Sequence, residues 1–230
     1  MRPADIAALS VFLAAWLLYE PMLTLLAKRR GGVLNTDMTV IRAAWMANMI
    51  RRESRFMDGQ LFGHALNSAS FFASSNLILI AATAGALFGG ERTFASVSAL
   101  ELVRTSSRLL FEVQLALVLI ALARGLLDFI WSIRQLNYCI AALGAAPDPT
   151  PPEDQAKYAA VAARLINPAL SAFNAGVRGY YFALAAAAWL FGPWAFMATT
   201  TGAVALLLWR QSASASASAT RDLRRLLEGG

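Results

Sequence analysis

Residues 109–140, LLFEVQLALVLIALARGLLDFIWSIRQLNYCI, restrict the possible fold of this chain more than any other stretch. The first half is apolar and long enough to enter a bilayer, which takes about 20 residues of helix. The second half keeps the helical pattern but carries Arg124, Asp128 and Arg134. Because such a residue at a helix centre costs roughly 3 kcal/mol on insertion scales, these side chains should face protein, water or lipid headgroups. The stretch therefore predicts a membrane helix with a charged end.

The composition agrees with a membrane protein. The 230 residues are 58% hydrophobic and 15% charged, whereas a soluble globular domain is nearer a quarter charged. The net charge of +6 suits contact with anionic lipid headgroups. No basic run interleaves with aromatic residues on a polar domain, so we expect no nucleic-acid partner. Cys139 is the single cysteine, which excludes an intrachain disulfide.

Four apolar stretches are long enough to cross a membrane, namely residues 6–27, 61–87, 109–133 and 180–208. Gly192-Pro193 lies inside the fourth stretch and predicts a kink, because Pro193 leaves the Trp189 carbonyl without its donor. Residues 38–60 and 153–166 have the pattern of amphipathic helices at one membrane face.

These features predict an all-α integral membrane bundle of four transmembrane helices, with amphipathic helices at one membrane face. The membrane domain is expected to cover residues 1–211. Residues 212–230 form a Ser/Ala-rich tail with a short basic end, and its low complexity predicts disorder.

Four crossings would put both termini on one side of the membrane. Residues 28–60 and 134–178 then lie together on the opposite side, with eleven Lys and Arg residues against eight on the side of the termini. The positive-inside rule places the richer side in the cytoplasm and both termini outside. We expect a multi-pass protein of the plasma membrane, which in a bacterium is the inner membrane.

Charged residues gather where the second, third and fourth stretches begin or end on that shared side. Forked guanidinium groups suit phosphate or carboxylate, so we expect an anion- or lipid-binding site there. Its candidate residues are Arg52, Arg55, Arg134, Arg178, Gln135, Tyr180 and Tyr181. A buried polar network is expected beside it, formed by Arg124, Asp128, His64, Asn174, Glu53 and Asp58.

The alternative for the same residues is a structural set of ion pairs. Arg124 and Asp128 are four residues apart on one helical face and can pair. Asp128 could instead pair with Arg178 across a helix interface. In both cases the loss of one partner would leave the other buried and unpaired.

No pattern of residues indicates catalysis, a metal or a cofactor. The chain has no nucleophile elbow and no HExxH, and residues 85–92, GALFGGER, lack the Lys-Ser/Thr of a phosphate-binding loop. His64 is the only histidine and has no second His or Cys at ligand spacing, which argues against a metal site. An enzyme is therefore the least expected class.

Four separated motifs carry a resemblance to a known family. They are RAAWMANMIRRESRFMDGQ (42–60), SASFFASSN (68–76), FIWSIRQLNY (129–138) and FNAGVRGYYFALA (173–185). In this order they resemble domain of unknown function 599, an uncharacterised family of membrane proteins in bacteria and plants. The resemblance runs over about residues 40–210. It implies a multi-pass helical membrane protein, and it implies no established activity and no catalytic residue.

Two classes of function remain open. The first is a small homo-oligomeric channel or transporter with an Arg-rich anion site at one membrane face. The second is a non-transporting scaffold or sensor that binds anionic lipid or a partner protein. A transport path needs polar residues across the whole bilayer, and these fade in residues 78–88 and 185–192. The expected partners are membrane lipids, further copies of the chain and a small anionic ligand.

Overall fold

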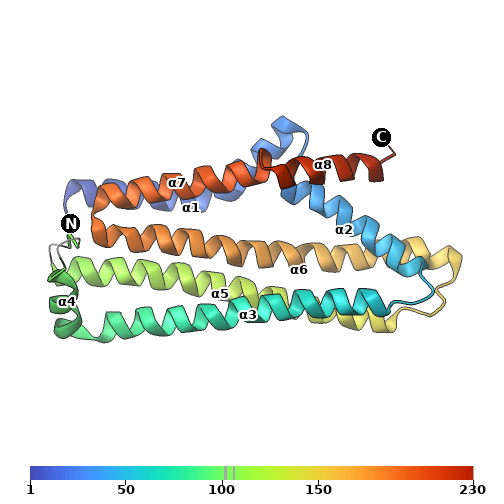
Figure 1. Ribbon diagram of the computed structural model, residues 1–230, viewed down its shortest axis with the longest axis horizontal. Coiled ribbons are helices and arrows are strands. Elements are labelled where there is room, and N and C mark those ends of the chain that lie inside the picture. The colour runs from blue at the N-terminus through green and yellow to red at the C-terminus, as the bar shows by residue number, and fades with distance from the viewer. Residues whose placement is uncertain (101–102, 106, 230) are drawn as a thin grey trace. The chain divides into compact units, whose positions relative to one another are not determined.

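The computed structural model describes residues 1–100, 103–105 and 107–229, and every regular element in these ranges is helical. The prediction of an all-α fold is confirmed. In chain order (Figure 1) the elements are α1 (Pro3–Arg30), α2 (Leu34–Arg51), α3 (Phe56–Phe88), α4 (Gly90–Ser98), α5 (Arg108–Ala145), α6 (Pro152–Ala187), the 3-10 turn η1 (Ala188–Phe191), α7 (Pro193–Ser212) and α8 (Ala215–Leu227).

Three helices, α1, α3 and α5, are long and apolar enough to cross a membrane. They contain 28, 33 and 38 residues. A helix rises about 1.5 Å per residue, so each is longer than the roughly 30 Å hydrocarbon core. The first three predicted stretches fall within these helices. A fourth crossing is not confirmed, because residues 180–208 are divided among α6, η1 and α7.

Gly192-Pro193 reverses the chain, where we predicted a kink within one helix. The α6 helix ends at Ala187, η1 follows, and Gly192 has a φ of +111°, which residues with a side chain rarely adopt. Pro193 then begins α7, at a position where a missing N–H costs no helical hydrogen bond. The Thr199 hydroxyl of α7 donates to the Ala185 carbonyl of α6 at 3.4 Å, so α7 returns beside α6 (Figure 1).

The helices divide into two compact units. Unit 1 consists of Met1–Leu25, Ser74–Leu127 and Gly176–Leu208, and unit 2 of Leu26–Ala73, Asp128–Ala175 and Trp209–Gly230. Of the 20 Lys and Arg residues, 6 belong to unit 1 and 14 to unit 2. Of the 14 acidic residues, 5 belong to unit 1 and 9 to unit 2. Unit 2 therefore carries most of the net positive charge.

Unit 1 is built on aromatic packing and on one close helix crossing. The Phe12 ring of α1 lies against Phe182 of α6 and Phe196 of α7, with centroids 5.9 and 5.1 Å apart. Where α5 meets α6, a Cβ atom built on Gly179 would lie 3.1 Å from the Cα atom of Gly125. Glycine lets two helix backbones approach this closely, which is a favoured way to pack helices in a membrane.

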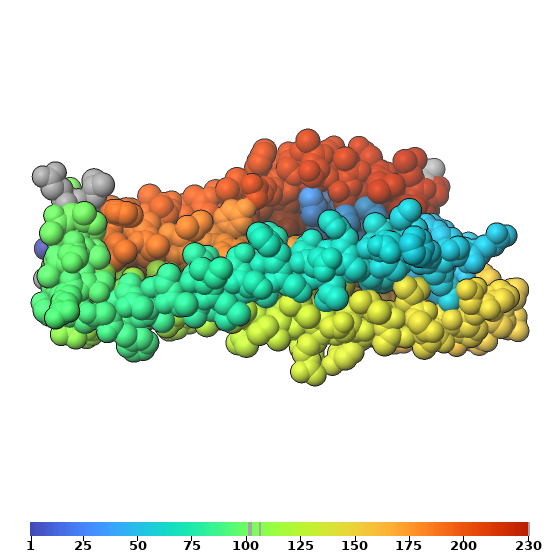
Figure 2. Space-filling model, turned by 60° about the horizontal axis from the view of Figure 1, so that its bottom comes forward, coloured from blue at the N-terminus to red at the C-terminus, as the bar shows by residue number. Residues whose placement is uncertain are grey.

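Unit 2 packs α2 against the first half of α3, the second half of α5 and the first part of α6. Figure 2 shows the first half of α3, in cyan, beside the second half of α5, in yellow, and there Phe72 stacks on Phe129 at 5.8 Å. Phe173 of α6 contacts both rings. The buried core includes Met46, Met49, Ile50, Phe62, Leu136 and Ile166. Residues 28–60 and 134–175 thus lie in one unit, whereas residues 176–178 belong to unit 1. That residues 28–60 and 134–178 share one side of the membrane stays a prediction.

The end of the chain is helical and packs on α2, where we expected a disordered tail. Alanine has the highest helix propensity, and the alternating Ser/Ala run supplies it on every second residue. The Ser214 hydroxyl oxygen accepts a hydrogen bond from the Ala217 N–H at 3.1 Å and caps α8. Because α8 contacts α2, the C-terminus lies with residues 28–60. The prediction that it lies opposite them is wrong, since the reversal at Gly192 adds one helix.

Replacement of Gly179 by alanine tests the crossing of α5 and α6. The new methyl group would lie 3.1 Å from the Gly125 Cα atom, so the two helices must move apart. We expect Gly179→Ala to lower the free energy of unfolding in detergent by roughly 1–3 kcal/mol. Gly202→Ala is the matched control, because a Cβ atom there meets nothing within 4 Å and alanine favours the helix. Equal stability of the two variants would contradict the close crossing.

Candidate functional site

Asp58 holds the junction between α2 and α3. It lies in the first turn of α3, and its side chain is fully buried. Its Oδ1 atom accepts hydrogen bonds from Trp45 Nε1 at 2.7 Å and from Arg52 Nη1 at 2.5 Å. The Trp45 ring also stacks on Phe62, with centroids 5.2 Å apart. Arg52, a candidate for the anion site, is therefore already paired with a carboxylate.

Arg55 joins the connection between α2 and α3 to the loop between α5 and α6. Its Nη1 atom donates to the Ala146 carbonyl at 2.9 Å. Its Nη2 atom donates to the Pro147 carbonyl and to the Thr150 hydroxyl, both at 2.7 Å. These contacts use both ends of the guanidinium fork, so this second candidate also has a structural role.

Arg178 belongs to unit 1 and forms an ion pair with Glu20 of α1. Its guanidinium lies over the Tyr19 ring, 5.4 Å from the centroid. Of the two partners considered for Asp128, Arg178 is thus paired elsewhere, and the pairing of Asp128 with Arg124 stays a prediction. The neighbouring candidates Tyr180 and Tyr181 are half-buried in unit 1.

The other predicted residues do not form one buried network. Of the six network residues, the structure fully buries Asp58, leaves Asp128 and Asn174 half-buried, and exposes Arg124, His64 and Glu53. Arg134 is exposed, with its Nη2 atom 3.4 Å from the Tyr138 hydroxyl. Gln135 beside it is buried. Helical spacing shows which residues share a face, but it does not show which face turns inward.

Arg42, which we did not select from the sequence, is a buried cation for which the described residues supply no hydrogen-bond partner. It lies in the middle of α2, and 5% of its surface is exposed. Its Nε and Nη1 atoms are buried and make no hydrogen bond within the described part of the chain. Burial lowers the pKa of its guanidinium. Since a buried charge is strongly unfavourable unless it is paired, Arg42 is suited to hold an anion.

Polar groups of α2 and α6 lie one to two helical turns before Arg42 along α2. Side chains on a helix lean toward its N-terminus, which directs Arg42 toward Thr39 and Asn35. Asn167 of α6 donates from Nδ2 to the Thr39 carbonyl at 3.4 Å. The Oδ1 atoms of Asn167 and Asn35 are also buried and have no partner among the described residues. A side-chain amide can turn either its oxygen or its NH2 group toward a ligand, so both residues can adapt to an anion.

The sequence contains a signal for Arg42. Met46 and Met49 follow it by four and seven residues, which places all three on one face of a helix. Both methionines belong to the buried core of unit 2. An arginine on the apolar face of an amphipathic helix therefore predicts a buried cation.

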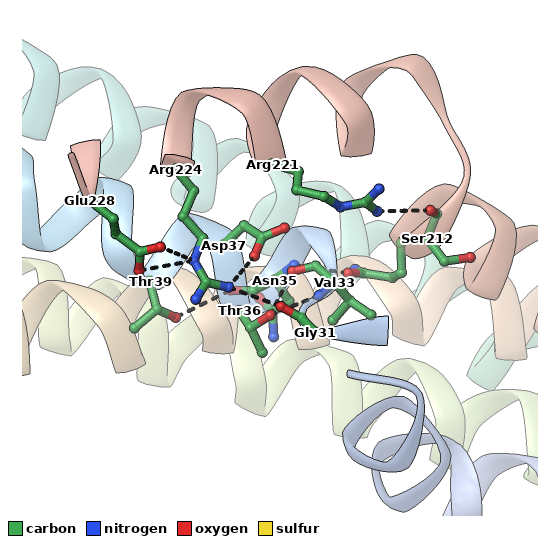
Figure 3. A network of polar contacts seen from close by, with 11 residues as sticks. Gly31, Val33, Asn35, Thr36, Asp37, Thr39, Ser212, Arg221, Arg224 and Glu228 are labelled. Atoms are coloured by element: carbon green, nitrogen blue, oxygen red, sulfur yellow. Dashed lines mark hydrogen bonds and ion pairs between the residues drawn. The ribbon is translucent and has the colours of Figure 1, made fainter. Parts of the chain in front are cut away.

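A network of polar contacts attaches α8 to the start of α2. Figure 3 shows Arg224 Nη1 donating to Asp37 Oδ1 at 2.9 Å and to the Gly31 carbonyl at 3.3 Å. The Asp37 side chain is fully buried, and its hydrogen bond raises the pKa of Arg224. A Cβ atom on Gly32 would lie 2.5 Å from Asp37 Oδ1, so this position requires glycine. Asp37 thus pairs with Arg224 and not with Arg42.

Several buried polar side chains of unit 1 are bonded to the protein itself, whereas the hydroxyls of Tyr19 and Thr200 have no hydrogen-bond partner in the described part of the chain. Asn76 of α3 donates to the Leu122 carbonyl of α5 at 2.9 Å. Gln114 of α5 donates to the Trp189 carbonyl at 3.0 Å, and the Trp189 ring N–H donates to Asp5 at 3.0 Å. These bonds join elements that are far apart in the sequence, which is the role of polar residues between membrane helices.

Comparison with known proteins gives one match. The model of a family described as "Protein of unknown function, DUF599" matches residues 7–216. The matched range begins in α1 and ends at the start of α8. No curated protein and no solved structure matches the chain.

Loss of Arg224 should release α8 from α2. Arg224→Gln leaves the Asp37 carboxylate buried without its cation, and a hydrogen bond to a charged group contributes enough to change the opening equilibrium on the order of tenfold. We expect amide hydrogen exchange in residues 215–227 to accelerate by about that factor. Arg225→Gln is the matched control, because the Arg225 side chain is 70% exposed and its acidic contact, Asp222, lies on the same helix. Equal exchange in both variants would show that Arg224 does not hold α8.

Proposed function

The chain belongs to the DUF599 family, whose description assigns no activity, and we propose that it is a multi-pass membrane protein that binds an anion at Arg42. In this proposal it works as a sensor or scaffold and does not transport the anion. The observation that carries the proposal is the burial of the Arg42 guanidinium, with 5% of the residue exposed and two nitrogen atoms unpaired.

The proposed ligand carries a phosphate or carboxylate group. A guanidinium presents two parallel N–H donors that match either group. Asn35 precedes Arg42 on α2, and Asn167 contacts α2 at Thr39. Their buried Oδ1 atoms have no partner among the described residues and are neutral groups that suit a ligand whose charge is balanced by one arginine. The predicted candidates Arg52, Arg55 and Arg178 have protein partners, so the anion site moves from them to Arg42. The phosphate of an anionic lipid and a small anionic solute share this chemistry.

The proposed membrane arrangement has five crossings in place of the four predicted from the sequence. The helices α1, α3 and α5 have the length and composition of membrane helices. We propose that the end of α6 and α7 cross as a hairpin, because the end of α6 and α7 up to Leu208 belong to the nearly neutral unit 1. Unit 2 carries 14 of the 20 basic residues. By the positive-inside rule, unit 2 faces the cytoplasm.

The contacts in unit 1 favour a sensor or scaffold over a channel. An ion path needs polar groups that are free to exchange partners along its length. Asn76 and Gln114 instead bond to backbone carbonyls of neighbouring elements. Assembly of the chain into a homo-oligomer stays a prediction.

Replacement of Arg42 by methionine tests the anion site, because the proposal predicts the sign of the change in the free energy of unfolding. Methionine has a similar length and no charge. Without an anion, Arg42→Met should raise the free energy of unfolding by roughly 1–4 kcal/mol, because it removes a buried charge that has no partner. Added inorganic phosphate, or phosphatidylglycerol in a nanodisc, should stabilise the wild type and not the variant. Thermal unfolding of the purified chain measures both effects.

Arg51→Met is the matched control, since Arg51 lies on the same helix but is exposed. It should leave both the stability and the response to phosphate unchanged. A loss of stability in Arg42→Met without anion, together with no response of the wild type to phosphate or lipid, would refute the site. Anion flux into liposomes that Arg42→Met abolishes would show a transporter and overturn the sensor or scaffold.

A further inference from the structure

Unit 2 contains an apolar cavity of about 220 Å³. Its walls come from α2, α3, α5 and α6, and they include Met46, Met49 and Ile50 of α2 and Phe62 of α3. These four residues are at most 3% exposed. The wall contains almost no polar surface, and an apolar cavity of roughly 150 Å³ is already large enough to hold benzene. The cavity can therefore enclose a stretch of hydrocarbon, and its lining offers almost nothing to hold water.

The cavity is partly open between α5 and α6. Tyr158 and Val161 of α6 line it and are 36% and 45% exposed, and Ala145 at the end of α5 lines it and is exposed. Four of the lining residues are alanines, and their small side chains leave the space beside them unfilled. Unfilled apolar space lacks the packing contacts that a bound chain would supply.

Polar contacts on two sides keep the cavity from closing. Arg55 fixes the loop that follows α5 through the Ala146 and Pro147 carbonyls. Asp58 fixes α2 to α3 through Trp45 and Arg52. The walls are thus positioned before any ligand arrives, which reduces the entropy lost on binding.

We propose that this cavity binds one hydrocarbon chain of an amphiphile, which enters between α5 and α6 with its polar end outside at Tyr158. The tail lies against Met46, Met49, Ile50 and Phe62. Methionine adapts its shape to flexible apolar ligands, which suits an acyl chain with many conformations. A membrane lipid and a free fatty acid supply the same chain. This site goes beyond the anion site at Arg42 and does not depend on it.

Cys139 provides a reporter, because it is the only cysteine and lies in the cavity wall. The purified full chain in phosphatidylcholine nanodiscs is treated with N-ethylmaleimide, with and without dodecanoate, and alkylation is followed by intact mass. Bound dodecanoate should slow the reaction by about tenfold at ten times its dissociation constant. No slowing at any concentration would overturn the proposal. Alkylation that slows as the protein concentration rises, and does not depend on dodecanoate, would also overturn the proposal. A second copy of the protein would then cover the cavity.

Two neighbouring alanines provide the variants. Ala142 lines the cavity, whereas Ala141 is exposed and does not. Ala142→Leu should fill the cavity and abolish the effect of dodecanoate without loss of thermal stability, and Ala141→Leu should behave as the wild type. If both variants respond to dodecanoate as the wild type does, the hydrocarbon chain binds elsewhere and the proposal fails.

Photo-crosslinking identifies whether a membrane lipid or a free fatty acid supplies the bound hydrocarbon chain. Phosphatidylglycerol with a diazirine on one acyl chain and a diazirine fatty acid are tested in separate nanodisc samples. Cross-links to peptides that contain residues 46–50 or 139–146 support the proposal, and the sample that gives them shows whether lipid or free fatty acid supplies the chain. Cross-links confined to α1 and the first half of α5, in either sample, contradict it. Arg42→Met should leave these cross-links unchanged, so this site and the anion site can fail separately.

Discussion

The rest of the structure depends on how the chain pairs buried charge. A carboxylate or guanidinium out of water needs a partner of opposite charge. The fully buried Asp37 and Asp58 meet this need with Arg224 and Arg52, each partly exposed. The first pair attaches α8 to α2, and the second closes the turn from α2 into α3. Arg42 lies on α2, as Asp37 does, and differs from both carboxylates because no described residue bonds to its Nε and Nη1 atoms.

The two units solve the problem of burying polar groups in different ways. Unit 1, which has few charges, uses neutral amides such as Asn76 and Gln114 that bond to backbone carbonyls. Unit 2 uses ion pairs and the carbonyl contacts of Arg55. A neutral amide costs less to remove from water than a charge does.

Unit 2 also combines firm polar contacts with loose apolar packing. Asp58 and Arg55 fix the ends of the helices, whereas small side chains between α5 and α6 leave space in the interior. A core that only had to be stable would fill such space, since cavities lower stability. Helix ends fixed by polar contacts around an unfilled apolar interior are expected in a helical bundle that binds a ligand.

The sequence by itself determined the helical class, the apolar lengths of α1, α3 and α5 and, through four motifs, the family. These features follow from local composition and periodicity, which act within one helix. The tertiary structure decided that the chain turns back at Gly192 and that α8 folds onto α2, because proline and glycine mark an interruption without giving its direction. It also decided which arginines are paired. The predicted crossings placed Arg52, Arg55 and Arg178 at one membrane face. Their partners are instead Asp58, the loop after α5 and Glu20, and no described residue bonds to the Nε and Nη1 atoms of Arg42.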